Sequence, residues 1–561
     1  SAKVKGAVLR YGAQWPNIER IDGDLLFRGR RMEINASQGF SMGARLSGVR
    51  AEIADLAQQR LLTVAGDAEG QTTDFLKFIS ASPVSGFIDR FTEGMQAEGA
   101  GRLRLRLDIP LLSLERTRVA GGYQFLSNKL QIDPAVPVLE QVTGRLDFSE
   151  TGFNVPSATA VFLGGPLTVA GSTQRDGSIR LNLTGRLNPE TLLRAGGPRW
   201  LAYARGSTDW QGTITVRKKT VDAVVESNLQ GLAMNLPAPL LKTAAESLPL
   251  RVERRFVTQD KDQYAINLGD LLSARFERHV EANRWVIDRG AVRMGGGAAP
   301  EPPRAGVMIS GALRSLDADA WMKFLEQQSA PAGATPAGAD VSYTLAGLDV
   351  KVGDLKLHER KFTDIAVAAG GAQGELTRYR VTGREVEGTV DWNARGRGAV
   401  MARLKTLILP AVGAGAADTA KSARPGDLDA SRFPALDVIA ENFQMGARAM
   451  GKLELRAVPQ DRDWRIEQLR LTHADSILTV DGLWRSRQAN PHTHLNVHWA
   501  VLDAGKAAER FGFPGTLRRG RSIIAGTLDW NGSPLQIDYP SLSGKIALQA
   551  VAGQFAKMEP G

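Results

Sequence analysis

Apolar and polar residues alternate strictly along many short segments of this chain. In residues 102–109, Leu103, Leu105, Leu107 and Ile109 alternate with three arginines and an aspartate. This period of two places the apolar side chains on one face of a β-strand and the charged side chains on the other. Because one face is exposed to solvent, the pattern favours an antiparallel sheet over a parallel sheet, which is buried on both faces.

The same alternation recurs along the rest of the chain, between turn signals such as DG at 176–177 and NG at 531–532. We therefore predict a mainly β protein built as a long, largely antiparallel meander. The apolar positions predicted to share one face are Leu103, Leu105, Leu107, Ile109, Val142, Leu146, Phe148, Leu167, Val169, Ile179, Leu181, Leu183, Leu453 and Leu455.

Helical periodicity is rare in this sequence. Short helices are predicted within residues 72–91, after Asn188 as a cap, and within residues 236–245, 317–328 and 503–511. Residues 295–305 are rich in Gly and Pro and are predicted to form a hairpin loop. Residues 328–340 and 411–432 are rich in Ala, Gly and Pro, and we predict a flexible linker and a disordered loop there. The chain is accordingly divided into residues 1–327 and 341–561.

So many amphipathic strands leave a large apolar face that must be covered. A second sheet, the far wall of a closed barrel, or a ligand bound to a curled open sheet could each cover it. Thirty-odd strands at about 4.8 Å spacing would span about 150 Å in one sheet. A transmembrane barrel is disfavoured because it needs aromatic girdles, and only 6% of the residues are aromatic.

Composition and charge exclude several classes of function. The net charge is +10, but 70 basic residues are interspersed with 60 acidic ones, so no nucleic-acid partner is predicted. The chain has no cysteine and therefore no disulfide or thiolate site. No run of about 18 apolar residues predicts a membrane-spanning helix, and no signal-peptide pattern opens the chain.

Motifs of catalysis are also missing, so no enzyme, metal or cofactor is predicted. His492, His494 and His498 share one strand face, but the first and third lie about 20 Å apart along a strand, too far for one ion. An exposed polar face explains them better. Residues 102, 104 and 106 are arginines that form a basic ridge. Two interpretations are open: a solvated surface that protects the sheet against unwanted strand pairing, or a binding surface for lipid head groups.

Several segments, in order, resemble the YhdP family of AsmA-like bacterial envelope proteins. The N-terminal part contributes GAVLRY (6–11), GDLLF (23–27) and AEIADL (51–56), followed by the more specific NLQGLAMNLPAPL (228–240). The part after the linker, which is similar to the AsmA-like C-terminal region, contributes FPALDV (433–438), DGLW (481–484), FGFPGT (511–516) and GTLDWNGSP (526–534).

The resemblance implies a bridge-like lipid transporter. Its sheet would curl into an elongated open hydrophobic groove that carries phospholipid through the periplasm between the inner and outer membranes. An N-terminal anchor in the inner membrane and a C-terminal part that reaches the outer membrane are expected outside this fragment. The positions predicted to share one face would line the groove. The competing hypothesis is a structural or assembly scaffold of the envelope that packs this face shut and carries no lipid.

Overall fold

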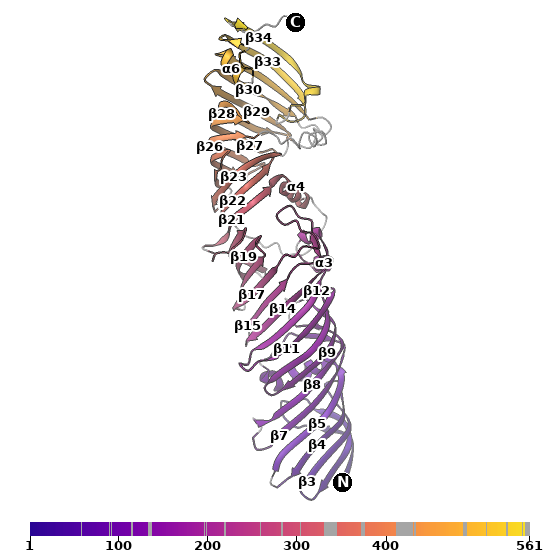
Figure 1. Ribbon diagram of the computed structural model, residues 1–561. Coiled ribbons are helices and arrows are strands. Elements are labelled where there is room, and N and C mark those ends of the chain that lie inside the picture. Colours follow the sequence, from indigo (N-terminus) through magenta and orange to yellow (C-terminus); the bar gives the residue numbers. More distant parts are fainter. Residues whose placement is uncertain are drawn as a thin grey trace.

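The computed structural model of the chain is an elongated sheet with the two termini at opposite ends (Figure 1). It describes residues 1–561 except 58, 89, 91, 114–115, 133–136, 196, 198, 218–219, 259, 282–283, 303, 330–344, 372–375, 411–429, 431–432, 486–490, 512, 516, 535–536, 553 and 556–561. The strands run across the long axis of the molecule, so each additional strand makes the sheet longer (Figure 1).

The described residues form 31 strands of one sheet and two small two-stranded sheets. The strands up to residue 317 are β1 (Ala2–Leu9), β2 (Ile18–Arg28), β3 (Arg31–Ser41), β4 (Ala44–Asp55), β5 (Gln59–Gln71), β6 (Gln96–Glu98), β7 (Ala100–Pro110), β8 (Arg118–Gln131), β9 (Leu139–Ser149), β10 (Gly152–Phe162), β11 (Gly165–Thr173), β12 (Ile179–Leu187), β13 (Ala204–Gly206), β14 (Thr208–Arg217), β15 (Thr220–Ser227), β16 (Leu232–Met234), β17 (Leu250–Thr258), β18 (Lys261–Leu268), β19 (Leu272–Glu281), β20 (Arg284–Met294) and β21 (Gly306–Asp317).

The remaining strands are β22 (Leu345–Leu357), β23 (Arg360–Gly370), β24 (Leu376–Thr382), β25 (Val386–Asn393), β26 (Ala399–Leu409), β27 (Ala435–Met445), β28 (Arg448–Gln460), β29 (Asp463–His473), β30 (Ser476–Arg485), β31 (His492–Val501), β32 (Leu517–Arg518), β33 (Arg521–Asn531), β34 (Ser543–Val551) and β35 (Gln554–Phe555). The helices are α1 (Thr72–Ser80), α2 (Val84–Phe87), α3 (Pro189–Arg194), η2 (Arg199–Tyr203), α4 (Ala318–Ser329), α6 (Ala504–Arg510) and η4 (Tyr539–Ser541). The prediction of a mainly β chain with a few short helices is confirmed.

Strand pairing follows the chain order, and most neighbouring strands are antiparallel, as predicted. Within the described residues three pairs are parallel: β20 with β21, β21 with β22, and β26 with β27. A parallel pair needs a connection that returns from one end of a strand to the other. The prediction of a hairpin loop at residues 295–305 is therefore wrong, because this segment is the crossover between β20 and β21.

Most of the helix predictions are confirmed. Asn188 caps α3, since its side-chain oxygen accepts a hydrogen bond from the Glu190 backbone N–H at 2.8 Å, and Asp503 caps α6 in the same way. The predicted helix at 72–91 is two helices, α1 and α2, with Pro83 immediately before α2.

The helix predicted at residues 236–245 is absent. Pro237 and Pro239 remove two backbone donors from this segment. Its backbone instead bonds to that of Met234, which exchanges N–H···O bonds of 2.8 and 3.0 Å with Lys242. The apolar spacing that suggested a helix therefore belongs to an irregular loop.

The predicted linker and loop fall largely outside the described part of the chain. Residues 330–340 and all of 411–432 except 430 are not described, and residues 328 and 329 end α4. Strands β21 and β22, on either side of the linker, pair along their length. The division of the chain into residues 1–327 and 341–561 stays a prediction.

The two long sides of the sheet differ in their connections. On one side the strand ends lead into α1, α3, α4 and α6, and we call this side the helix rim. On the opposite side most strands are joined by short turns such as residues 29–30, 150–151 and 174–178, and we call it the hairpin rim. Cover by helices is therefore expected at the helix rim and not at the hairpin rim.

Candidate functional site

The strand register places the predicted apolar positions on one face of the sheet, called here the apolar face. Leu103 pairs with Tyr123, which pairs with Leu146, and Val169 pairs with Leu183. Residues that face each other across two strands point to the same side of the sheet. The remaining predicted positions lie an even number of residues from these on their own strands.

The same face continues through the middle of the molecule without changing sides. Stepwise pairings connect Leu183 to Leu455 through Gly212, Val225, Val252, Ile266, Ala274, Val292, Ile309, Leu348, Ala369, Tyr379, Val390, Ala402 and Val438. Leu455 then pairs with Leu469, and Leu453 with Leu471. Positions about 350 residues apart in the sequence therefore share one continuous surface.

Most of the predicted positions on this face are only half-buried. Val142, Leu167 and Leu453 are buried, at 5%, 3% and 7% exposure, whereas Leu105 and Leu181 keep intermediate exposure. Aliphatic side chains in a closed sandwich or a filled barrel are packed on all sides. Apart from the main sheet, the described residues form only the two-stranded pairs β13–β16 and β32–β35, so no large second sheet covers the apolar face.

Partial cover comes from the helix rim, through aromatic contacts. Phe75 in α1 packs edge-on against Tyr123 with ring centroids 5.2 Å apart, and Phe511 at the end of α6 packs against Trp499 at 5.6 Å. Tyr123 and Trp499 both belong to the apolar face by register. The helices therefore fold inward over the strand ends, and among the described residues none lies over the opposite side of the face.

A compact loop structure covers the helix rim near β17 and β18. Strands β13 and β16 pair, and their buried residues Ala204, Leu232 and Met234 pack with Leu250 and Leu268 of the main sheet. Helix α4 packs on this structure through Phe324, whose ring lies 4.7 Å from that of Tyr203. The resemblance-bearing segment 228–240 thus forms a cap on the rim.

One buried lysine holds that cap together. The Nζ of Lys242, which is 5% exposed, donates to the backbone carbonyls of Leu229 and Leu232 at 2.7 Å each and of Thr243 at 3.0 Å. Burial lowers the pKa of Lys242, and the negative charge of Glu246 opposes this effect. The sequence pattern does not reveal this role, because the lysine lies outside the alternating strands.

A second piece of cover comes from the segment that leads into β27. Phe433 packs edge-on against Trp464 and Trp484, with ring centroids 5.8 and 5.0 Å apart, and Ala430 is fully buried in the same cluster. Trp464 and Trp484 pair with each other on the apolar face. Ala430 and Phe433, just before β27, therefore lie on the apolar face.

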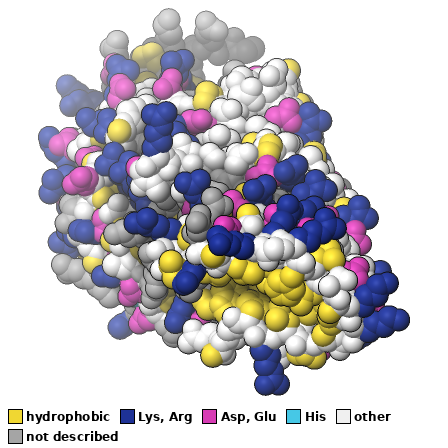
Figure 2. Space-filling view, turned by 90° about the horizontal axis from the view of Figure 1, so that it is seen from below, with side chains coloured by type: hydrophobic (Ala, Val, Ile, Leu, Met, Phe, Trp, Pro, Cys, Tyr) yellow, Lys and Arg dark blue, Asp and Glu magenta, His cyan; other side chains and the backbone are white. Residues whose placement is uncertain are grey.

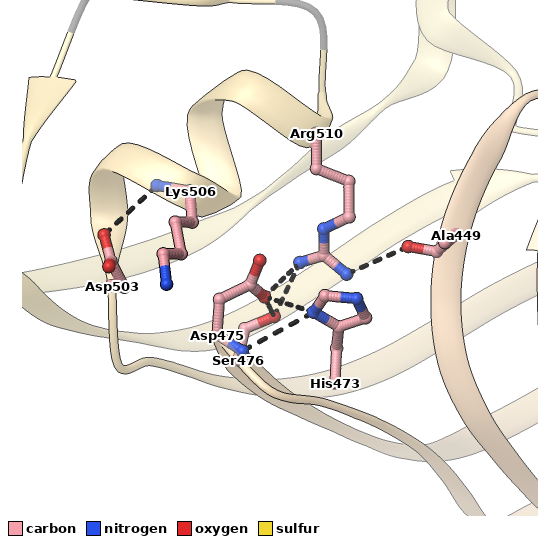
Figure 3. A network of polar contacts seen from close by, with 7 residues as sticks. All are labelled: Ala449, His473, Asp475, Ser476, Asp503, Lys506 and Arg510. Carbon is pink, nitrogen blue, oxygen red and sulfur yellow. Dashed lines mark hydrogen bonds and ion pairs between the residues drawn. The ribbon is translucent and has the colours of Figure 1, made fainter.

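Polar contacts fix α6 to the helix rim (Figure 3). Arg510 donates to the Asp475 carboxylate at 2.7 Å, to Ser476 Oγ at 2.8 Å and to the Ala449 carbonyl at 3.2 Å. His473 Nδ1 lies 2.9 Å from the same carboxylate. The network joins the helix to the ends of β28, β29 and β30.

The basic ridge lies on the polar face, on the side of the sheet opposite Leu103 and Leu105. Its arginines pair with acidic neighbours, as in Arg102 with Glu69 at 2.9 Å and Arg104 with Asp67 at 3.1 Å. Viewed from the N-terminal end, hydrophobic side chains gather in one area that Lys and Arg side chains border (Figure 2). Near the N-terminal end, charged and apolar side chains thus lie on different faces of the sheet.

The histidines of β31 also lie on the polar face. His492 Nε2 and His494 Nδ1 contact one oxygen of Asp529 at 3.2 and 2.8 Å. Burial alone would raise the pKa of Asp529, but the two hydrogen bonds outweigh it and lower the pKa. In the described part of the chain, no group of three or more His, Cys, Asp or Glu residues is arranged to hold a metal ion.

Sequence reasoning missed three charged residues on the apolar face. Arg254, Asp262 and Arg278 lie on β17, β18 and β19, where the register predicts apolar side chains. The alternation could have revealed them: Arg254 lies two residues after Val252 and two before Phe256, at a position where the pattern expects an apolar side chain.

Comparison with known proteins identifies the family of this chain. Residues 1–561 match the family described as YhdP protein. The chain is 22% identical over 579 residues to the "Intermembrane phospholipid transporter YhdP" of Escherichia coli (strain K12), an alignment that covers 100% of this chain and 44% of that protein. The chain thus spans less than half the length of this relative. Among the described residues no helix is long and apolar enough to cross a membrane. Because the family match covers the entire chain, the chain belongs to the YhdP protein family.

Proposed function

We propose that this chain carries the acyl chains of phospholipids along its apolar face, as one section of a conduit between the inner and outer membranes. The observation that carries the proposal is the apolar face itself, which is continuous from β5 to β33 and has no second large sheet over it in the described residues. The printed name of the Escherichia coli relative, an intermembrane phospholipid transporter, supports the choice of cargo.

The energetics favour lipid as the cover. Apolar area removed from water contributes about 25 cal/mol per Å2, so a bound acyl chain and the half-buried side chains stabilise each other. The attraction is non-directional, so a chain that slides along the face loses one set of contacts while it gains an equivalent set. With about 24 steps between neighbouring strands from β5 to β33, at about 4.8 Å each, the face extends for about 115 Å along the sheet.

In this proposal the residues predicted from the sequence line the path of the acyl chains, and no catalytic step or cofactor is involved. Leu105 and Leu181 represent the N-terminal half of the path and Leu455 the C-terminal half. The whole protein would work in the periplasm, anchored in the inner membrane. The curl of the sheet would turn the apolar face into an open groove, with residues 1–327 and 341–561 as its two parts.

The proposal is tested by native mass spectrometry and lipid extraction of the chain purified from bacterial membranes. Phospholipid is expected to copurify with the unsubstituted chain. A Leu105→Asp/Leu181→Asp variant should lose most of this lipid, because each carboxylate places a charge on the path of an acyl chain. Circular dichroism establishes that the variant remains folded.

A matched control carries two new carboxylates on the polar face of the same region. Thr143→Asp/Asn182→Asp changes exposed residues that lie beside the apolar positions in sequence but point to the opposite side. This control should keep its lipid. If neither the unsubstituted chain nor the control carries phospholipid, the conduit is wrong and a scaffold that carries no lipid becomes the better explanation.

A further inference from the structure

A cluster of charged residues interrupts the apolar face near the hairpin rim. Phe256 on β17 pairs with Asp262 on β18, which pairs with Arg278 on β19. Arg254 lies two residues before Phe256 and therefore points to the same side. All of them share the face of Val252 and Ile266, which pair with each other farther along the same strands.

Asp262 lies at the centre of this cluster and is completely enclosed. Its side chain has 0% exposure. It accepts hydrogen bonds from Arg254 Nε at 3.0 Å, from Arg278 Nε at 2.9 Å and from Arg278 Nη2 at 2.9 Å. One carboxylate therefore balances two guanidinium groups, and the cluster keeps a net charge of about +1.

The two arginines are held in different ways. Arg278 stacks on Tyr264 and Trp285, with its Cζ 4.3 and 4.7 Å from the ring centroids. Burial would lower the pKa of Arg278, but hydrogen bonds and the charge of Asp262 outweigh burial and raise it, so the group stays charged. Arg254 uses Nε for Asp262, and its Nη groups have no hydrogen-bond partner among the described residues.

The exposures of the two arginines match this difference. The Arg254 side chain is 33% exposed and that of Arg278 is 21% exposed. An unneutralised charge on an apolar surface is unfavourable unless a counter-charge meets it. Arg278 alone already satisfies both oxygens of Asp262, so Arg254 supplies a positive charge that no second carboxylate of the described residues balances.

The position of the cluster suits a lipid that lies parallel to the strands, from the hairpin rim toward the helix rim. From the hairpin rim toward the helix rim, the apolar face of β18 presents Asp262, Tyr264, Ile266 and Leu268 in turn. The distance from the first to the last is about 20 Å at about 3.3 Å per residue. One acyl layer of a bilayer is about 15 Å thick, half of its hydrocarbon core. The cap already covers Leu268, so a polar head at Asp262 would place the tails on Tyr264 and Ile266, which lie before the cap.

We propose that Arg254, with Arg278 behind it, binds the phosphate of a phospholipid head group while the acyl chains of that lipid lie on the apolar face. A guanidinium presents paired N–H donors that match the oxygens of a phosphate. The inference rests on the proposed function and adds a place where the lipid pauses. It assigns this section of the sheet a preference for lipids that carry a phosphate.

The test compares two probes with identical oleoyl chains, dioleoyl phosphatidylethanolamine and dioleoylglycerol, of which only the first has a phosphate. The full chain is mixed with each lipid in detergent, and native mass spectrometry gives the fraction bound. Arg254→Gln should lower phosphatidylethanolamine binding about tenfold at limiting lipid, because charge-assisted hydrogen bonds are lost. Binding of dioleoylglycerol should stay unchanged.

Arg255→Gln is the matched control, since Arg255 neighbours Arg254 on β17 but points to the polar face with a side chain that is 72% exposed. It should bind both lipids like the unsubstituted chain. Arg254→Lys keeps the charge without the paired donors and should recover part of the phosphatidylethanolamine binding. This variant also serves as the test if Arg254→Gln does not fold.

The outcomes separate the two proposals. Equal loss of both lipids in Arg254→Gln, or no loss of either in a folded variant, would overturn the head-group site and leave the conduit intact. Absence of both lipids from the unsubstituted chain would overturn the conduit and the site together. A third arm adds inorganic phosphate: if it binds at Arg254 and phosphatidylethanolamine does not, the site takes free phosphate and the lipid assignment is wrong.

Discussion

Arg510 and Asp475 form a buried ion pair between α6 and the turn that joins β29 to β30. Their side chains are 10% and 3% exposed, and Arg510 Nη2 lies 2.7 Å from Asp475 Oδ1 (Figure 3). The pair is part of the contact that holds α6 on the helix rim, where Phe511 covers Trp499 on the apolar face.

Replacement of Arg510 by Met should free α6 from the rim. Removal of one partner from a buried pair costs about 3–5 kcal/mol, because the remaining charge stays buried without a counter-charge. Hydrogen exchange of residues 504–510 should become faster by at least tenfold. Lys506→Met changes an exposed residue of the same helix and should leave the exchange unchanged. Equal exchange in both variants would contradict the anchoring role.

Asn128 links α1 to the strands beneath it. It has 0% exposure and donates through Nδ2 to Thr72 Oγ1 at 2.7 Å and to the carbonyls of Glu98 and Ala100 at 3.2 and 3.1 Å. Asn128→Ala should destabilise this region by about 2–3 kcal/mol, because buried polar groups lose their partners. Faster hydrogen exchange of residues 72–80 is the readout. Asn154→Ala, at an exposed position of β10, is the control and should leave that exchange unchanged.

Phe433, two residues before β27 at the end of the crossover from β26, packs against the apolar face. Phe433→Ala should cost about 3 kcal/mol, because truncation leaves a cavity between Trp464 and Trp484. Limited proteolysis should then cut this crossover sooner than in the unsubstituted chain. Phe27→Ala removes a side chain that is 55% exposed and should not alter the cleavage pattern. Unchanged cleavage in Phe433→Ala would show that the aromatic contacts do not fix the segment.

One ion pair on the polar face should make stability depend on pH in acid. Arg378 donates to both oxygens of Asp391 at 2.7 and 2.8 Å, and these hydrogen bonds lower the pKa of Asp391. The folded pKa therefore lies below the unfolded value of about 3.9. The contribution is present above that value and is lost as the pH falls through the lowered pKa.

The urea midpoint of unfolding, measured from pH 6 down to pH 2, tests this dependence. Asp391→Asn should show a smaller fall in acid than the unsubstituted chain, and Arg378→Gln should show a similar reduction. The effect is small because Arg378 is 70% exposed and water screens the pair. A full acid dependence in Arg378→Gln would rule out the pair as its source.

The sequence by itself determined the β class, the two faces and the family. Alternation such as that of Leu103, Leu105 and Leu107 with arginines is a local pattern, and the period of two assigns each side chain to a face before any partner strand is known. The caps Asn188 and Asp503 are local in the same sense, because a side chain bonds to a backbone group two or three residues away.

Tertiary structure alone decided the parallel pairs, the irregular cap around Lys242 and the surroundings of Arg254. Each depends on segments that are distant in sequence: β26 and β27 pair across a long crossover, and Lys242 replaces a helix by bonding to carbonyls up to 13 residues away. The sequence shows that Arg254 falls in the apolar phase of its strand. Only the register of β17, β18 and β19 shows that Asp262 balances half of the positive charge there, because charges on separate strands meet through folding.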